Sequence, residues 1–327
     1  LIDHISKGVE LHQSSSLLGI GDDAAMVDPN GQAMVMSTDL LCEGVHFNLM
    51  YAPLKHLGYK AVMVNISDIY AMNATPTQVL VSVALSNRFS VEAVNELYDG
   101  IKTACAKHDV DLVGGDISSS TSGLTISVTA CGVVNETEVV KRSGAQKGDL
   151  LIVSGDLGAA YMGLQILERE KEVFQAAPTA QPDLSGFEYL LERQLKPEAR
   201  RDVVELLAQL EVTPTSMIDI SDGLASEALH LSKASGKSIK IFEEKLPIHP
   251  QTKTAAEQFS LDVTTPALNG GEEYELLFTV SQDHYDTVKD APEWTIIGYV
   301  GDEEGGNELI TKSGQVVPLT AQGWKHV

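Results

Sequence analysis

The chain has 327 residues, of which 43% are hydrophobic and 27 are glycine, and no uninterrupted apolar run approaches the roughly 20 residues needed to cross a bilayer. Its 46 acidic and 23 basic residues give a formal net charge of −23, which disfavours nucleic-acid binding and binding of bare nucleotides. We therefore expect no membrane span and no nucleic-acid partner, and two domains, because a single core rarely grows beyond about 250 to 300 residues.

The cysteines bear on the cellular compartment. Cys42, Cys105 and Cys131 are widely spaced and form no paired zinc-ligand pattern, which suits a reducing interior. No secretory signal pattern is visible at the N-terminal end of the sequence. The prediction is a cytoplasmic protein.

The first half of the chain alternates predicted helices and strands. Apolar residues at helical spacing predict helices over 56–72 and 91–107. The runs TQVLVSVALS (77–86) and LTISVTACGVV (124–134) are rich in β-branched residues and predict strands. This pattern indicates an α/β domain over 1–137.

The second half begins after a basic connector, VVKRSGAQKGD (139–149). Strands are predicted at 150–155, up to Asp219, and at 237–242, 274–280 and 295–300, with helices at 159–171, 198–210 and from Gly223 onward. The Pro- and Ala-rich stretch 175–186 is expected to be a surface loop. The fold class is therefore α/β with mixed sheets, and the second α/β domain covers 138–327.

Polar residues follow apolar runs repeatedly. Each of these, taken alone, is explained by a turn or a helix cap, but together they predict a shared ligand site. Because Mg²⁺ takes one or two protein carboxylates together with phosphate oxygens and waters, such a site suits a magnesium–nucleotide enzyme despite the acidic net charge. The stretches are Asp22–Asp23 after a glycine turn, Ser37–Thr38–Asp39, Asp68 after Asn65, Asp116 after the Gly114–Gly115 pair, and Asp219 with Asp222.

The segment SMIDISDGLA (216–225) carries the last of these. Side chains alternate along a strand, so Asp219 and Ser221 are expected to share the face opposite Ile218 and Ile220. Asp222 or Ser221 is an alternative N-cap for a helix ended by Gly236. Capping leaves Asp219 unexplained, whereas ligands gather at strand ends in α/β folds.

Several motifs, taken in chain order, resemble the thiamine-monophosphate kinase family over nearly the whole chain. DISDGL and the GGD strand are also similar to those of aminoimidazole-ribonucleotide and selenophosphate synthetases, whereas TDLLCEGVHF and GGEEYELLF are more specific to the kinases. The motifs are GIGDDAAMV, STDLLCEGVHF, VNISDIYAMNATP, VGGD, RSGAQKGD, IDISDGLASEALHLSKASG, GGEEYELLF and the terminal GW before His326. No GxxxxGK[ST] phosphate loop is present.

The resemblance implies ATP-dependent phosphorylation of thiamine monophosphate to thiamine diphosphate, several Mg²⁺ ions, and a homodimer formed by the N-terminal domain. It implies direct in-line transfer in which metal and positioning supply the catalysis, with no protein nucleophile. The metal residues implied are Asp23, Ser37, Thr38, Asp39, Asp68, Asp116, Asp219 and Asp222. The ATP contacts implied are Tyr98, Gly115, Asp116, Arg142 and Ser221, and the residues facing thiamine monophosphate are His46, Glu272 and Trp324.

Some of these residues have plainer readings. Arg142 is alternatively a solvated charge in the linker. His46 is alternatively a core histidine with its hydrogen bonds satisfied, and Trp324 is alternatively a residue that only packs. Glu273 is the alternative to Glu272.

The sequence departs from the family pattern in that no arginine follows GGD, Asn73 replaces a glycine, and Glu273 replaces an aspartate. The arginine spacing after Pro197 is also unusual, so Arg200 receives no role. Another ATP-dependent enzyme of the same superfamily, or a non-catalytic metal- or nucleotide-binding protein, remains the alternative function.

Overall fold

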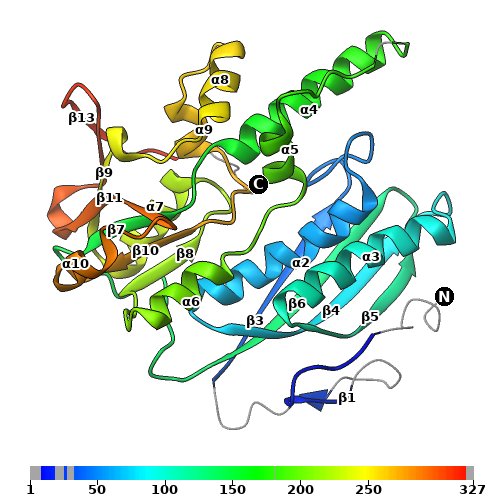
Figure 1. Ribbon diagram of the computed structural model, residues 1–327, viewed down its shortest axis with the longest axis horizontal. Helices are drawn as coiled ribbons and strands as arrows, with labels where there is room; N and C mark the ends of the chain where they lie inside the picture. Colours follow the sequence, from blue (N-terminus) through cyan, green and yellow to red (C-terminus); the bar gives the residue numbers. More distant parts are fainter. Residues whose placement is uncertain (1–8, 19–25, 28–32, 180, 322–327) are drawn as a thin grey trace. The chain divides into compact units, whose positions relative to one another are not determined.

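The computed structural model describes residues 9–18, 26–27, 33–179 and 181–321. The chain divides into two compact units, Leu1–Val139 and Val140–Val327. The boundary expected from the sequence, between 137 and 138, lies two residues before this division. Each unit contains a mixed sheet and helices (Figure 1), which confirms the predicted α/β fold class.

The first unit has a four-stranded sheet in the order β3-β6-β4-β5, in which only β4 and β5 are parallel. Two helices lie on one face of this sheet (Figure 1). A separate antiparallel pair is formed by β1 and β2. The elements are β1 (Ser16–Leu18), β2 (Met26–Val27), β3 (Ala33–Cys42), α2 (Leu54–Ala71), β4 (Thr75–Leu85), α3 (Val91–His108), β5 (Asp111–Ser119) and β6 (Leu124–Val134).

The alternation along β6 explains how this sheet acquires a covered and an open face. Ile126, Val128 and Ala130 are fully buried, while the residues between them are half-buried. This is the period of two expected when helices cover one face of a sheet.

Helices α2 and α3 approach one another closely through two glycines. A Cβ atom on Gly58 would lie 2.0 Å from the Leu97 carbonyl oxygen, and one on Gly100 would lie 1.9 Å from the Lys55 carbonyl oxygen. No side chain fits at either position, so the two backbones are in direct contact.

The second unit has a seven-stranded sheet in the order β13-β12-β9-β11-β7-β10-β8, antiparallel throughout except between β12 and β9. Its strands are β7 (Leu150–Ser154), β8 (Ser216–Asp219), β9 (Ser238–Phe242), β10 (Leu276–Val280), β11 (Trp294–Gly301), β12 (Glu308–Ile310) and β13 (Val316–Pro318). Its helices are α4 (Ala159–Ala176), α5 (Glu188–Leu195), α6 (Arg201–Gln209), α7 (Leu224–Ser235), η1 (Glu243–Lys245), α8 (Pro250–Gln258), α9 (Thr264–Asn269), η2 (Gln282–His284), α10 (Tyr285–Val288) and η3 (Glu303–Gly305).

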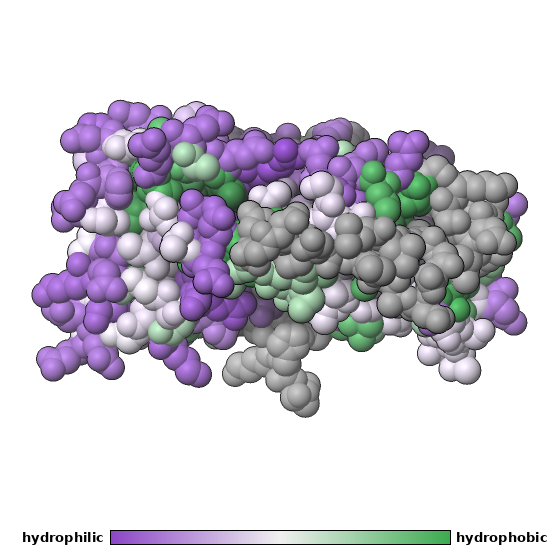
Figure 2. Space-filling model, turned by 90° about the horizontal axis from the view of Figure 1, so that it is seen from below, coloured by the Kyte–Doolittle hydropathy of each residue, from purple (hydrophilic) through white to green (hydrophobic). Residues whose placement is uncertain are grey.

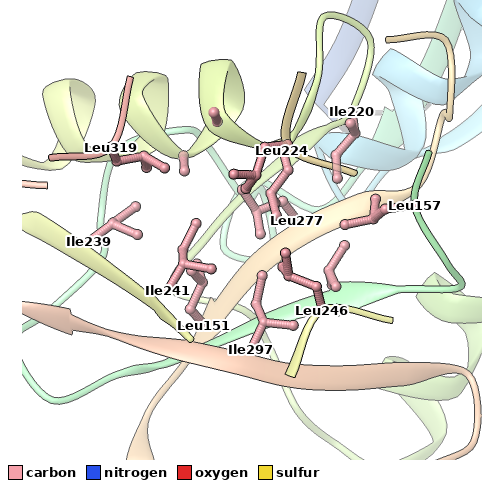
Figure 3. Packing of buried hydrophobic residues seen from close by; sticks show 14 of the residues in the cluster. Leu151, Leu157, Ile220, Leu224, Ile239, Ile241, Leu246, Leu277, Ile297 and Leu319 are labelled. Atoms are coloured by element: carbon pink, nitrogen blue, oxygen red, sulfur yellow. The ribbon is translucent and has the colours of Figure 1, made fainter. Parts of the chain in front are cut away.

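The main core of this unit lies between α7 and the sheet. Leu224 at the start of α7 points toward the sheet residues Leu277, Ile241 and Ile297 (Figure 3). A second apolar cluster joins α4, α5 and α8 through Met162 and Leu190, among others. The surface seen in Figure 2 is largely hydrophilic, with hydrophobic residues in separate patches, as the charge composition leads one to expect.

The predicted helices and strands are confirmed as elements, with ends shifted by a few residues. Three expectations are wrong. Ser37–Asp39 and Asp116 lie inside β3 and β5 and not at strand ends, because both strands continue in register with their neighbours. Neither Ser221 nor Asp222 is the N-cap of α7, since Gly223 holds that position with a φ of 112°.

Within the described part of the chain, no helix is long and apolar enough to span a membrane.

Candidate functional site

In the first unit, β3 and α2 bring two predicted metal ligands together. Ser37 Oγ donates to Asp68 Oδ2 over 2.5 Å, and the Asp39 backbone N–H donates to Asn65 Oδ1 over 2.9 Å. Burial, together with the charge of Asp68, raises the pKa of the Asp39 carboxyl to about 6. A divalent cation would relieve both effects by supplying the missing positive charge.

Asn65 is a residue that the sequence reading did not single out as a site residue. Its side-chain N–H donates to the Ala61 carbonyl oxygen over 2.9 Å, which orients its amide oxygen toward β3. The signal for it was the spacing of Asn65 and Asp68, three residues apart and therefore on one face of a helix.

Thr38 is oriented away from this pair. Its hydroxyl donates to the Val128 carbonyl oxygen over 3.0 Å and lies 2.9 Å from the Thr129 hydroxyl. Because neighbouring strand residues point to opposite faces, the hydroxyl of Thr38 does not join Asp39 and Asp68.

Tyr98 and Asp116 interact electrostatically, although they come from α3 and β5. Burial raises the pKa of the Tyr98 hydroxyl to about 12, and the negative charge of Asp116 contributes. A Cβ on the neighbouring Gly115 would lie 1.8 Å from the Val81 carbonyl oxygen. The close approach that requires this glycine is therefore to strand β4.

His46 is exposed and lies in the turn after β3. Its Nδ1 accepts a hydrogen bond of 3.0 Å from the Cys42 backbone N–H. The core-histidine reading is wrong, because the side chain is exposed.

In the second unit, two segments carry most of the predicted residues and are hydrogen-bonded to each other. Asp219 ends β8 and is 4% exposed. Beyond it, the Glu272 N–H donates to the Ser221 carbonyl oxygen over 2.7 Å, and the Tyr274 N–H donates to the Ile220 carbonyl oxygen over 2.9 Å. A Cβ on Gly271 would lie 2.4 Å from the Ser221 carbonyl oxygen, so the glycine permits this contact.

The side chain of Glu227, in the first turn of α7, stabilises the Ser221–Asp222 turn by hydrogen bonds. Its Oε1 accepts the Asp222 N–H over 2.9 Å, and the Ser221 hydroxyl lies 3.4 Å away. Glu227 is 2% exposed, and burial raises the pKa of its carboxyl to about 7, with Asp222 adding to the rise. Sequence reasoning missed this residue, because a glutamate in the first turn of a helix is ordinarily a solvated cap.

Arg142 lies in the connector beside β8. The carbonyl oxygen of the preceding residue, Lys141, accepts the Met217 N–H over 3.0 Å, which pairs the connector with that edge strand. The Arg142 side chain itself is exposed. Both readings of Arg142, a phosphate contact and a solvated charge, are compatible with this position.

Glu272 and Glu273 have very different environments, which bears on the choice between them. Glu273 is 1% exposed and forms a 2.8 Å ion pair with Arg193, whereas Glu272 is half-buried. Burial raises the pKa of the Glu273 carboxyl to about 7 against the opposing effect of Arg193. Glu272 is therefore the accessible member of the pair.

Arg193 and Arg200 form a buried charge network with Glu273 and Glu275. Arg193 Nη1 lies 2.8 Å from Glu275 Oε1, and Arg200 Nη1 pairs with Glu275 Oε2. The Ser154 hydroxyl donates to the same carboxylate over 2.5 Å. Arg200, which received no role from the sequence, thus anchors the segment that carries Glu272.

The donor set fits magnesium better than a softer metal. In the described residues, no three His, Cys, Asp or Glu side chains converge on one point within metal-ligand reach. The Asp39–Asp68 pair supplies carboxylates and no thiolate or imidazole, which is the chemistry of Mg²⁺ bound through one or two carboxylates plus substrate phosphates. Asp23 and Trp324 lie outside the described residues.

Both units match models of known families. Residues 21–134 match the AIR synthase related protein, N-terminal domain, and residues 146–310 match the AIR synthase related protein, C-terminal domain. Hydrogenase maturation protein HypE has a similar structure with a TM-score of 0.79 at 18% identity. At that identity the likeness shows the fold alone.

Several relatives are similar over nearly their whole length. The chain is 37% identical to the thiamine-monophosphate kinase of Aquifex aeolicus (strain VF5), covering 100% of this chain and 96% of the relative. It is 34% identical to that of Bacillus subtilis (strain 168), covering 97% and 95%. A solved structure of AaThiL complexed with AMPPCP and TMP has a TM-score of 0.79 and 35% identity, covering 94% of this chain and 92% of that one. The family resemblance inferred from the motifs is confirmed, and the chain belongs to the thiamine-monophosphate kinase family.

Proposed function

We propose that the chain transfers the γ-phosphate of ATP to thiamine monophosphate, giving thiamine diphosphate. The observation that carries the proposal is the hydrogen bond from Glu272 N–H to the Ser221 carbonyl oxygen, at 2.7 Å. Through this bond Glu272, which we propose to contact the acceptor, lies next to Ser221, which we propose to contact ATP. The relatives named thiamine-monophosphate kinase and the complex with AMPPCP and TMP support the same assignment.

The proposed division of labour follows the site residues. Magnesium, when bound, neutralises phosphate charge during in-line transfer. Magnesium ligands are proposed in each unit: Asp39, Asp68 and Asp116 would serve in the first and Asp219 and Asp222 in the second, with Asp23 and Ser37 completing the set. Thr38, which the resemblance also implies, has its hydroxyl on the opposite face of the sheet. ATP contacts come from Tyr98, Gly115, Asp116, Arg142 and Ser221, and acceptor contacts from His46, Glu272 and Trp324.

The chemistry of these side chains supports the roles proposed for them. A planar guanidinium such as that of Arg142 suits phosphate oxygens, and the indole face of Trp324 suits a positively charged thiazolium ring. Two anions must approach each other, so holding them in position contributes most of the rate. No side chain is required to form a bond to phosphorus.

We also propose a homodimer through the open face of the first unit's sheet. The register places Thr38, Thr129 and Leu80 in one row and Leu40, Ser127 and Ser82 in the next. Leu40 is 53% and Leu80 is 37% exposed, so one face carries apolar groups from separated strands. Exposed apolar patches of this kind mark protein interfaces. Light scattering of the wild type and of Leu80→Lys tests the dimer.

The activity is tested by incubating the protein with ATP, Mg²⁺ and thiamine monophosphate and detecting thiamine diphosphate by mass. We expect product that depends on both substrates and disappears with EDTA. Product from another acceptor alone would favour the related synthetases, and ATP binding without transfer would favour a non-catalytic protein. Trapping a kinetically competent phosphoenzyme would exclude direct transfer.

A further inference from the structure

Glu272 lies in a backbone conformation that requires support. Its φ is 66°, and that of Tyr274, two residues later, is 54°. Both values fall in the left-handed region that non-glycine residues rarely occupy, and such conformations persist where the surroundings over-determine them. The question is which residues hold the segment.

Two carboxylates that alternate with these residues anchor the segment inward. Glu273 Oε1 accepts the Ala160 N–H at the start of α4 over 3.1 Å, and its Oε2 accepts from Arg193 Nη2 over 2.8 Å. Arg193 Nη1 donates to Glu275 Oε1 over 2.8 Å. One guanidinium of α5 therefore bridges two carboxylates on the C-terminal side of Glu272, with one terminal nitrogen on each, as the several donors of the planar arginine fork allow.

The next residue of α5 contacts Glu272 itself. Gln194 is 6% exposed, and its Nε2 donates to Glu272 Oε2 over 3.1 Å. The Tyr274 hydroxyl lies 3.4 Å from the other carboxylate oxygen, Oε1. The carboxylate of Glu272 is thus directed by a buried amide, while its backbone is fixed through Arg193.

We propose that Gln194 is a positioning residue for the acceptor site, orienting the Glu272 carboxylate toward thiamine monophosphate, with Arg193 holding the backbone in place. This inference rests on the proposed function. Gln194 acts through Glu272, so its removal impairs acceptor binding and leaves ATP binding largely as it was. A residue that served only the fold would lower stability without distinguishing the two substrates.

The test compares Gln194→Leu with the wild type. Leucine is close in size and cannot donate a hydrogen bond. We expect the KM for thiamine monophosphate to rise about 10- to 150-fold, the range of a hydrogen bond to a charged group, with little change in the KM for ATP. Glu192→Gln is the matched control on the same helix, because the Glu192 side chain is 66% exposed.

A double-mutant cycle separates positioning from structure. In a Glu272→Ala background, Gln194→Leu should add almost nothing to the acceptor KM, since the carboxylate it directs is gone. An additive effect there, or an equal rise in the KM for ATP, would overturn the inference. If Gln194→Leu does not fold, Gln194→Glu serves the same comparison, because a second carboxylate repels Glu272. Failure of the proposed function is distinct, since the wild type would then form no thiamine diphosphate.

Discussion

Ser37 and Asp68 are joined by a 2.5 Å hydrogen bond from Ser37 Oγ to Asp68 Oδ2, which ties the middle of β3 to α2. Replacing Ser37 with alanine should raise the Mg²⁺ concentration needed for half-maximal turnover about 2- to 10-fold, because a hydrogen bond of about 0.5 to 1.5 kcal/mol no longer orients Asp68. Turnover across a magnesium titration measures the effect.

Thr129→Val is the control for that substitution. The Thr129 hydroxyl lies 2.9 Å from the Thr38 hydroxyl, on the face of the sheet opposite Asp39 and Asp68. It should lower stability slightly and leave the magnesium dependence in place. An equal shift in both variants would mean that Ser37 acts through the fold and not through Asp68.

Asp219→Asn should nearly abolish phosphate transfer while the protein stays folded. Asparagine keeps the shape and a carbonyl acceptor at the end of β8 but loses the anion that would bind Mg²⁺. Excess metal should restore part of the turnover if other ligands remain. A structural role would instead cost about 1 to 3 kcal/mol of stability and spare turnover per folded molecule. Turnover at low and high Mg²⁺, beside a thermal melt, separates the two.

Glu227 should make the stability of the metal-free protein depend on pH. Burial raises the pKa of its carboxyl from 4.5 to about 7, so the folded protein favours the protonated form. Its contribution is fully present below pH 4.5 and is lost as pH rises through about 7.

In Glu227→Gln, which titrates no proton there, the loss of stability between these pH values should be smaller by roughly 2 kcal/mol. Urea unfolding at several pH values with EDTA present measures the difference. An identical pH profile in the two proteins would show that Glu227 is charged in the folded state across this range.

Gly100→Ala should destabilise the first unit by more than about 2 kcal/mol, because backbone atoms must separate to admit the methyl group. The comparison is Gly114→Ala, whose new Cβ would meet only the flexible end of the Leu80 side chain at 3.2 Å. Chemical denaturation measures both variants. Similar losses would mean that α2 and α3 move apart at little cost.

The sequence predicts the elements well where burial alternates regularly. β6 is an example, since every second residue is buried along its whole length. The sequence does not predict a strand at Ser37–Asp39, because a run of polar residues gives no clear strand pattern. These residues are in β3 because their pairing with β6 continues without interruption.

The charge network of Arg193, Arg200, Glu273 and Glu275 could not be predicted from the sequence for a different reason. Arg193 and Arg200 are 82 and 75 residues from the Glu275 carboxylate that both bind. No local pattern marks such partners, and a charged residue on a helix is ordinarily solvated. The path of the chain brings these four side chains together, with both glutamates buried and both arginines largely so.

The backbone contact between α2 and α3 that Gly58 and Gly100 permit has a consequence for Asp68, which lies on the same helix as Gly58. A helix that packs on side chains shifts when those side chains change in size. At Gly58 and Gly100, however, α2 and α3 pack through main-chain atoms. The depth of α2 against α3 is consequently insensitive to substitutions elsewhere in the unit's core. Mutational drift in that core can therefore proceed while the carboxylate of Asp68 keeps its distance from β3.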